Sequence, residues 1–243
     1  MANKLTVNVD KTNYMIIKTP QRNTTFEGNL SIGNDTIEQV SCASYLGVTI
    51  DSSLSWKYHI RKVVEVITPK IGIITRQRHY VPKSILIQLY NAFILPHIMY
   101  CLEIWGNTFS SYLEPIFRLQ KRIVRSITFS HFIAHSEPLF YKLNILDIYK
   151  LSKYCTCMFV YDLKHNNLPH TVEHYFEIPK HSYPTRLTQV ENFRIPGSNL
   201  TISQHNIRYA AVKHWNSLPD YLKQLSSRQV FKSALKHHLL NLH

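Results

Sequence analysis

This sequence of 243 residues is poor in acidic residues, glycine and cysteine: it has 15 aspartates and glutamates, 6 glycines and 4 cysteines. The cysteines, Cys42, Cys101, Cys155 and Cys157, are too few and too unevenly spaced for the disulfide framework of a small secreted protein. No secretory signal opens the sequence. We therefore expect an intracellular protein, in the nucleus or the cytoplasm.

Long hydrophobic runs are absent as well. A membrane-spanning helix needs about 20 predominantly apolar residues. The longest candidate, residues 85–105, is interrupted by Gln88, Asn91, His97 and Glu103. We expect no membrane partner.

Motifs for catalysis and for metal binding are also missing. Polymerases and nucleases that use two metal ions need at least two convergent carboxylates. The aspartates instead stand singly, as turns and helix caps do, at Asp10, Asp35, Asp51, Asp147, Asp162 and Asp220. Cys155, Cys157, His165 and His170 fit no zinc-binding spacing, and the sequence has no glycine-rich phosphate loop. We predict no metal site, no cofactor and no complete catalytic site in this chain.

Positive charge is what the sequence has in excess. Its 28 lysines and arginines give a formal net charge of +13. Between residues 66 and 136 the only acids are Glu103 and Glu114, and the basic residues are Lys70, Arg76, Arg78, Lys83, Arg118, Lys121, Arg122 and Arg125. Such a field favours a polyanionic partner, nucleic acid ahead of an anionic membrane. The alternative is a basic surface that only favours solubility.

The first 54 residues have the pattern of short strands. Alternating apolar residues predict a strand over residues 5–10, and a Gly-Asn-Asp turn predicts a hairpin within residues 30–40. Tyr45–Ile50 is predicted as a further strand, in which Gly47 lets a neighbouring backbone approach. A sheet of three to five short strands needs a second layer, so we expect the chain to begin inside a domain.

From Ser55 onwards the apolar spacing is helical. The inner face of the first helix is predicted to carry Ile60, Val63, Val64, Ile67, Ile71 and Ile74. Pro69 should kink or split that helix. A second helix should begin at Pro82 and end or bend at Pro96. Its predicted inner face consists of Ile85, Leu86, Leu89 and Phe93.

The third helix carries the strongest functional signal. Ser111 and Glu114 have the spacing of a capping box at its start. Its apolar stripe consists of Leu113, Ile116, Ile123, Val124 and Ile127. Arg118, Lys121, Arg122 and Arg125 fall within about 100° of one another on the opposite face, which predicts a wholly cationic surface that contacts phosphate. His79, Tyr80 and Trp105 are either stacking groups for bases or ordinary core and rim aromatics.

The remaining chain is predicted to be rich in helix. A fourth helix should span residues 148–164 with Asp147 as its cap, followed by an extended connector over about residues 168–200. One further helix should run from Gln204 to Trp215, and a capping box of Ser226 and Gln229 should open the last one. The predicted fold class is α+β, predominantly α.

Six stretches of the sequence together resemble one family. In chain order they are LTVNVDKTNYMII, YLGVTIDSSLSWKYHI, GIITRQRHYVPKSILIQLYNAFILPHIMYCLEIWG, LEPIFRLQKRIVRSIT, HSYPTR and VKHWNSLPDYLK. This ordered series resembles the C-terminal half of reverse transcriptases (RNA-directed DNA polymerases, a class of nucleotidyltransferase) of non-LTR retrotransposons, of the jockey and CR1-like group of transposable elements. The likeness covers nearly the whole chain.

The resemblance implies a division into three parts. Residues 1–54 would be a partial palm with motif D and the motif E hairpin, residues 55–130 a helical thumb, and residues 131–243 an α-rich C-terminal region. Lys11 would be the motif D lysine near the incoming nucleotide. The primer grip would consist of Tyr45, Leu46, Gly47 and Val48. The thumb would hold an RNA template and its DNA primer through the nucleic-acid-binding residues Arg76, Arg78, Arg118, Lys121, Arg122 and Arg125.

The catalytic Tyr-x-Asp-Asp turn of that family has no match in this sequence. The resemblance therefore implies a fragment that keeps nucleic-acid contacts but is inactive alone, with Mg²⁺ expected only in the intact enzyme and the missing N-terminal half as a further partner. Two alternatives remain open. One is a domesticated, non-catalytic module that binds RNA or an RNA:DNA hybrid, and the other is a helical protein-interaction domain whose charge is incidental.

Overall fold

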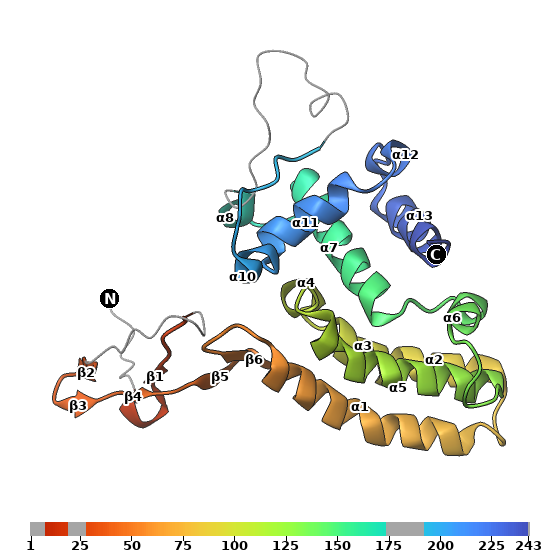
Figure 1. Ribbon diagram of the computed structural model, residues 1–243, viewed down its shortest axis with the longest axis horizontal. Helices are drawn as coiled ribbons and strands as arrows, with labels where there is room; N and C mark the ends of the chain where they lie inside the picture. Colours follow the sequence, from red (N-terminus) through yellow and green to blue (C-terminus); the bar gives the residue numbers. More distant parts are fainter. Residues whose placement is uncertain (1–7, 19–27, 174–191, 243) are drawn as a thin grey trace, which may run out of the picture. The chain divides into compact units, whose positions relative to one another are not determined.

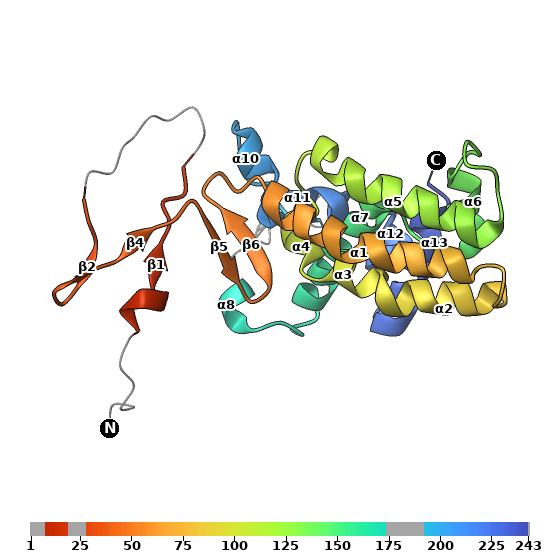
Figure 2. The same ribbon diagram turned by 90° about the horizontal axis from the view of Figure 1, so that it is seen from below.

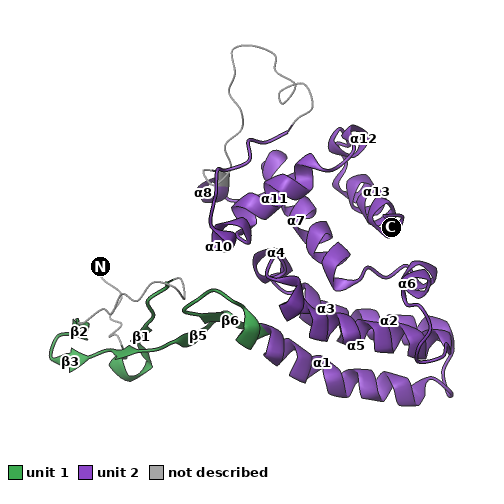
Figure 3. Cartoon of the chain, viewed as in Figure 1, with its two compact units in different colours: residues 1–59 green, residues 60–243 purple. Residues whose placement is uncertain are grey.

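The computed structural model describes residues 8–18, 28–173 and 192–242 (Figure 1). The described chain is mostly helical with three two-stranded sheets, which confirms an α+β class that is predominantly α. It divides into two compact units, residues 1–59 and residues 60–243 (Figure 3). The expected boundaries after residues 54 and 130 stay predictions, as does the origin of the first unit in a polymerase palm.

Unit 1 consists of short ribbons. A 3₁₀ turn, η1, precedes three strand pairs: β1 with β4 in parallel, and β2 with β3 and β5 with β6 antiparallel. Their bounds are η1 Val9–Lys11, β1 Asn13–Tyr14, β2 Ser31–Ile32, β3 Asp35–Thr36, β4 Glu38–Gln39, β5 Cys42–Tyr45 and β6 Val48–Asp51. A single sheet of three to five strands was the wrong expectation for these residues. The strand predicted over residues 5–10 is wrong at Val9 and Asp10, which lie in η1, and its first residues lie outside the described chain.

Both antiparallel pairs of unit 1 are hairpins. The predicted hairpin within residues 30–40 is confirmed by β2 and β3, with Gly33 at φ +63° in the turn. The continuous strand predicted over Tyr45–Ile50 is wrong, because Leu46 at φ +47° and Gly47 at φ +80° form a two-residue turn between β5 and β6. Positive φ at both central residues is what a tight antiparallel hairpin requires, and glycine adopts it without steric cost.

Asp51 organises the end of unit 1. The residue is almost completely buried, 4% exposed, and Oδ2 of its carboxylate accepts a hydrogen bond from the backbone N–H of Trp56 at 2.9 Å. Oδ1 accepts from the N–H groups of Ser53 and Ser55 at 3.1 and 3.0 Å. Burial opposes ionisation of this carboxyl, but the hydrogen bonds outweigh it and lower its pKa. The residue therefore shapes the turn before the first long helix, as predicted for a solitary aspartate.

That helix, α1 (Lys57–Gln77), is amphipathic and runs alongside α2 and α5 in two perpendicular views (Figures 1 and 2). Its predicted inner residues Ile60, Val63, Ile67, Ile71 and Ile74 are buried, whereas Val64 is partly exposed. The expected split at Pro69 does not occur, since the helix continues through that residue. Proline removes one backbone donor, which packing of the flanking isoleucines can offset.

Three helices follow the turn after α1. They are α2 (Lys83–Phe93), α3 (Leu95–Met99) and α4 (Leu102–Trp105). The buried residues of α2 are Leu86 and Tyr90, whereas Ile85 is 37% and Phe93 52% exposed, so the predicted inner face was about one residue position off. Pro82 lies at the N-cap, just before the helix instead of in its first turn.

Helix α5 (Ser110–Thr128) buries the whole predicted apolar stripe. Its capping box is a wrong prediction, because Phe109 is the N-cap residue and no side chain caps the helix. Gln120 is also buried, and its Nε2 donates to the Tyr90 hydroxyl at 3.0 Å and to the Leu146 carbonyl at 3.3 Å. Burial raises the pKa of Tyr90 to about 12. This polar bridge ties α5 to α2 and to the chain before the next long helix.

Helix α7 (Ile148–Lys164) is the centre of the C-terminal part. It packs against α4, α5, α11 and α13 (Figure 1), and its bounds and its Asp147 cap match the prediction. The Asp147 Oδ1 accepts from the backbone N–H groups of Tyr149 and Lys150 at 2.9 and 3.0 Å. Gly106 permits close approach at this contact, because a Cβ there would lie 2.8 Å from the Ser152 hydroxyl oxygen.

Short helices complete unit 2. They are α6 (Glu137–Leu143), α8 (His170–Glu173), α10 (Thr201–Gln204), α11 (Ile207–Asn216), α12 (Asp220–Lys223) and α13 (Arg228–Leu240). The single helix predicted from Gln204 to Trp215 is wrong at its start, because α10 ends at Gln204 and Asn206 caps α11. The Ser226 capping box is wrong too, since Ser227 is the N-cap residue and makes no side-chain cap. Much of the predicted connector, residues 174–191, lies outside the described chain.

Candidate nucleic-acid interface

The polar face of α5 carries the four basic residues that the sequence singles out. Arg118 and Arg122 are exposed, and Lys121 and Arg125 are partly buried. The face is not wholly cationic, because Glu114 lies on it at 3.0 Å from Arg118 Nε and 3.8 Å from Lys121 Nζ. This corrects the prediction for the N-terminal half of the face. The two arginines closer to the C-terminus of α5 lie in different surroundings.

Glu114 joins α5 to α7. Its Oε2 accepts a hydrogen bond from the Tyr149 hydroxyl at 3.2 Å. Burial opposes ionisation of Glu114, but the contacts with Arg118, Lys121 and Tyr149 outweigh it and lower the pKa of the carboxyl. Burial and the neighbouring Glu114 charge raise the pKa of Tyr149 to about 12. Two of the four basic side chains are therefore already engaged with a carboxylate.

The other two arginines open onto a hollow between the end of α1, the end of α5 and the chain that follows α5. We call it the arginine hollow. Its volume is about 410 Å³, and it is lined by Thr75, Arg78, Arg122, Arg125, Ser126, Ser130, His131 and Phe132. No carboxylate is among these lining residues. Three guanidinium groups thus surround one concavity without a neutralising acid.

Two of these guanidinium groups are held in place by contacts of one nitrogen or of the guanidinium face with described residues. Arg125 Nε donates to the Ala134 carbonyl oxygen at 2.8 Å. Arg78 Nε hydrogen bonds to His79 Nε2 at 3.0 Å, and Arg78 Cζ lies 5.5 Å from the centre of the Phe129 ring. Within the described ranges, Arg122 makes no hydrogen bond or ion pair. The hollow can therefore offer several donors to an anion.

Two hydroxyl groups in the hollow lack hydrogen-bond partners. Ser126 is 5% exposed, and its Oγ has no partner among the described residues. The buried Oγ1 atom of Thr75, on α1, has none either. A buried hydroxyl without a partner costs free energy, typically about 1–3 kcal/mol. Both oxygen atoms are themselves inaccessible to solvent, so they lie beneath the surface of the hollow.

The remaining predicted site residues lie elsewhere. Arg76 is exposed at the end of α1 but does not line the hollow. In unit 1, Lys11 ends η1, and its side chain makes no hydrogen bond or ion pair with any part of the chain that the structure describes. The predicted primer grip forms the β5–β6 turn, where Tyr45 and Leu46 are 68% and 73% exposed and Val48 is buried. Gly47 supplies the turn. The functional roles given to these residues stay predictions.

The predicted stacking aromatics differ in exposure. Trp105 is fully buried, and its indole N–H donates to the Tyr100 carbonyl at 2.9 Å, so it belongs to the core and cannot stack on a base. Tyr80 is 82% exposed, and Phe132, at the rim of the arginine hollow, is 76% exposed. Sequence reasoning did not select Phe132 because an isolated phenylalanine in a loop carries no periodic signal.

Ser126, Thr75 and His131 were missed for a similar reason. Residues of these kinds are common on helices and in loops, and they can be selected as site residues only when the structure shows that they lie beside the arginines. One signal was present: Ser126 is a polar residue within the apolar stripe of α5, between Val124 and Ile127. A buried serine at such a position has to be satisfied by a neighbour or a ligand.

The described part of the chain contains no group of three or more histidine, cysteine, aspartate or glutamate residues that could hold a metal ion. Burial raises the pKa of both Cys155 and Cys157 to about 12, so these thiols are protonated. None of the helices within residues 8–18, 28–173 and 192–242 has the length and hydrophobicity needed to span a bilayer.

Comparison with known proteins adds no family assignment: no protein-family model, no curated protein and no solved structure matches this chain.

Proposed function

We propose that this chain binds nucleic acid through the end of α5 and the end of α1, in the manner of a polymerase thumb that holds an RNA template and its DNA primer. The observation that carries the proposal is the arginine hollow, in which Arg78, Arg122 and Arg125 converge with no carboxylate. Guanidinium groups bind phosphate oxygens through paired hydrogen-bond donors. When they neutralise the phosphates of a nucleic acid, the cations condensed on that nucleic acid are released, which makes the binding depend on salt concentration.

The proposal also accounts for the uneven charge on α5. Arg118 and Lys121 are partly neutralised by Glu114, so we assign the main phosphate contacts to Arg122 and Arg125. The role as part of a non-LTR reverse transcriptase rests on the sequence resemblance. The duplex-binding role rests on the hollow and can be tested separately from it.

The test is the salt dependence of binding to a fluorescently labelled RNA:DNA hybrid, measured by anisotropy with the whole chain. Arg122→Gln should weaken binding at every salt concentration and lower the slope of log K against log [salt] by about 1, because one phosphate contact is lost. Lys213→Gln is the matched control, since Lys213 is an exposed cation on α11 and its loss changes the net charge equally. Binding that does not depend on salt, or equal effects of the two substitutions, would overturn the proposal.

A further inference from the structure

The arginine hollow is concave and could hold a single anionic group, whereas non-specific binding to nucleic acid requires only an open basic face. Its lining brings the guanidinium groups of Arg122 and Arg125, on α5, together with that of Arg78, which directly follows α1. We propose that the hollow binds a terminal phosphate monoester, carried by the end of a nucleic-acid strand or by a free nucleotide. This inference rests on the proposed nucleic-acid binding and names the ligand group at that site.

Charge favours a terminal phosphate over a phosphate within a strand. An internal phosphodiester carries one negative charge, whereas a monoester carries about −1.5 to −2 at neutral pH and presents three acceptor oxygens. The hollow offers the charges of Arg78, Arg122 and Arg125, with His131 beside them. A single diester would leave about two of these positive charges unmatched, and a monoester matches more of them.

The helix ends near the hollow oppose an anion but do not outweigh the arginines. The C-terminal ends of α1 and α5 each carry the equivalent of about −0.5 charge, and arginines near helix ends commonly stabilise that charge. Two such ends amount to about −1 against three guanidinium groups. Moreover, Arg125 Nε donates to the Ala134 carbonyl, which lies beyond α5. The net field in the hollow remains positive.

Ser126 and Thr75 also line the hollow, but their hydroxyl oxygens are inaccessible to solvent and lack partners among the described residues. These oxygens lie beneath the surface of the hollow. The donors that can reach a bound phosphate are therefore the guanidinium groups of Arg78, Arg122 and Arg125.

The rim of the hollow suits a nucleotide attached to that phosphate. Phe132 lines the hollow with 76% of its surface exposed, and its ring lies 4.6 Å from that of His131. Aromatic rings of this kind stack on bases without strong sequence preference. With the phosphate inside, the adjacent base or ribose would lie against Phe132.

The experiment compares three single-stranded oligonucleotides of one sequence, labelled at an internal base, with a 5′-phosphate, a 3′-phosphate or hydroxyl groups at both ends. Binding to the whole chain is measured by anisotropy, and a 5′-mononucleotide is tested as a competitor. We expect at least one phosphorylated end to bind about tenfold more tightly than the hydroxyl ends, as the gain of one or two charge-assisted hydrogen bonds requires.

Three variants decide whether the hollow causes that preference. Arg122→Gln and Arg78→Gln should each reduce the preference for a phosphorylated end well below the wild-type ratio, because each removes one of the three guanidinium groups that line the hollow. Arg118→Gln, on the same helix but outside the hollow, should weaken all three oligonucleotides equally and keep the ratio. Circular dichroism melting shows whether each variant is folded.

The outcomes separate this inference from the proposed function. Salt-dependent binding with no preference for phosphorylated ends would overturn the terminal-phosphate pocket and leave the proposed function standing. No binding to any oligonucleotide or hybrid would overturn both. If the mononucleotide competes with the oligonucleotides and Arg122→Gln abolishes this competition, the pocket is supported and a free nucleotide is one of its ligands. If the mononucleotide does not compete but the preference for a phosphorylated end remains, the pocket binds strand ends.

Discussion

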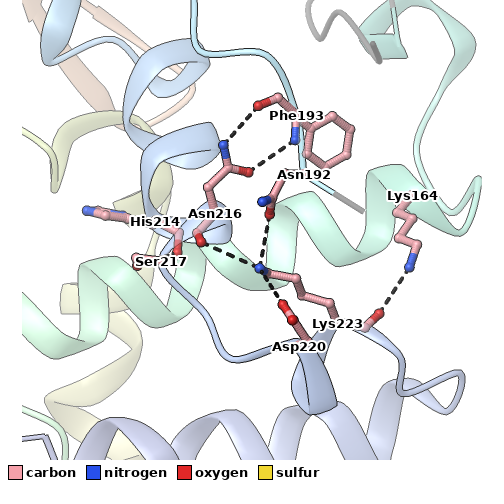
Figure 4. Close-up of polar contacts among 8 residues, drawn as sticks. All are labelled: Lys164, Asn192, Phe193, His214, Asn216, Ser217, Asp220 and Lys223. Carbon is pink, nitrogen blue, oxygen red and sulfur yellow. Dashed lines mark hydrogen bonds and ion pairs between the residues drawn. The ribbon is translucent and has the colours of Figure 1, made fainter. Parts of the chain in front are cut away.

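Lys223 is buried at the junction of α12 with the chain after residue 192, and its exposed fraction is 2% (Figure 4). Its Nζ donates to Asn192 Oδ1 at 3.0 Å, to Asp220 Oδ1 at 3.3 Å and to the Asn216 carbonyl at 3.5 Å. Asn216 in turn pairs with both backbone groups of Phe193 at 3.1 and 2.8 Å. These side chains fix the chain around residue 193 onto α11 and α12.

At the residue scale, Lys223→Met should destabilise the fold. The methionine keeps an apolar stem but removes the donor, so three acceptors lose a partner and the free energy of unfolding should fall by about 1–3 kcal/mol. Urea denaturation monitored by circular dichroism measures it. Lys213→Met, at an exposed position of α11, should change stability by less than about 0.5 kcal/mol. A variant as stable as wild type would mean that burying the ammonium costs as much as its hydrogen bonds return.

At the element scale, the start of α7 can be compared with the start of α13. Asp147 caps α7 with hydrogen bonds to two backbone N–H groups, whereas Ser227 occupies the same position of α13 without a side-chain hydrogen bond. Asp147→Ala should therefore lower the free energy of unfolding by about 1 kcal/mol, and Ser227→Ala should change it by only a few tenths. Thermal and urea unfolding of both variants provide the measurement. If both variants lost the same free energy of unfolding, the side-chain hydrogen bonds of Asp147 would contribute nothing to stability.

These two caps also show how far the sequence could predict the elements. Asp147 stands directly before a long amphipathic segment, so the cap and the bounds of α7 could be predicted. Glu114 has the correct spacing for a capping box, but Arg118, Lys121 and Tyr149 engage its carboxylate. Ser111 also lies inside α5, which begins at Ser110, so it cannot be the cap. Arg118 is a local partner one turn along the same helix, whereas Tyr149 comes from α7, and only that second contact depends on tertiary packing.

The candidate site shows the same limit. Arg122 and Arg125 could be placed on one face of α5 from helical periodicity alone. Their convergence with Arg78 depends on how α1 packs on α5, which no local pattern encodes. Ser126 and Thr75 become informative only when that packing leaves their hydroxyl groups buried and without partners.

At the scale of the whole molecule, the core is distributed unevenly between the two units. Among the described residues of unit 1, only Val48, Thr49, Asp51 and His59 are buried. Unit 2 contains the isoleucine faces of α1 and α5 and the fully buried Trp105 and Trp215. Two-stranded ribbons are marginal in water without a packed face, so the cooperative core is expected in unit 2.

Amide hydrogen exchange tests this distribution. Backbone amides in α5 and α7 should exchange at least about a thousandfold more slowly than those in β2 and β3, because the helical amides open only with the packed core. The β5–β6 hairpin should be intermediate, since its four cross-strand pairs include the buried Val48 and Thr49. Peptide-resolved mass spectrometry, corrected for intrinsic exchange rates, gives all three values in one experiment. Protection of β2 and β3 equal to that of α7 would mean that unit 1 is stabilised by more than the ribbons themselves, and would contradict a core confined to unit 2.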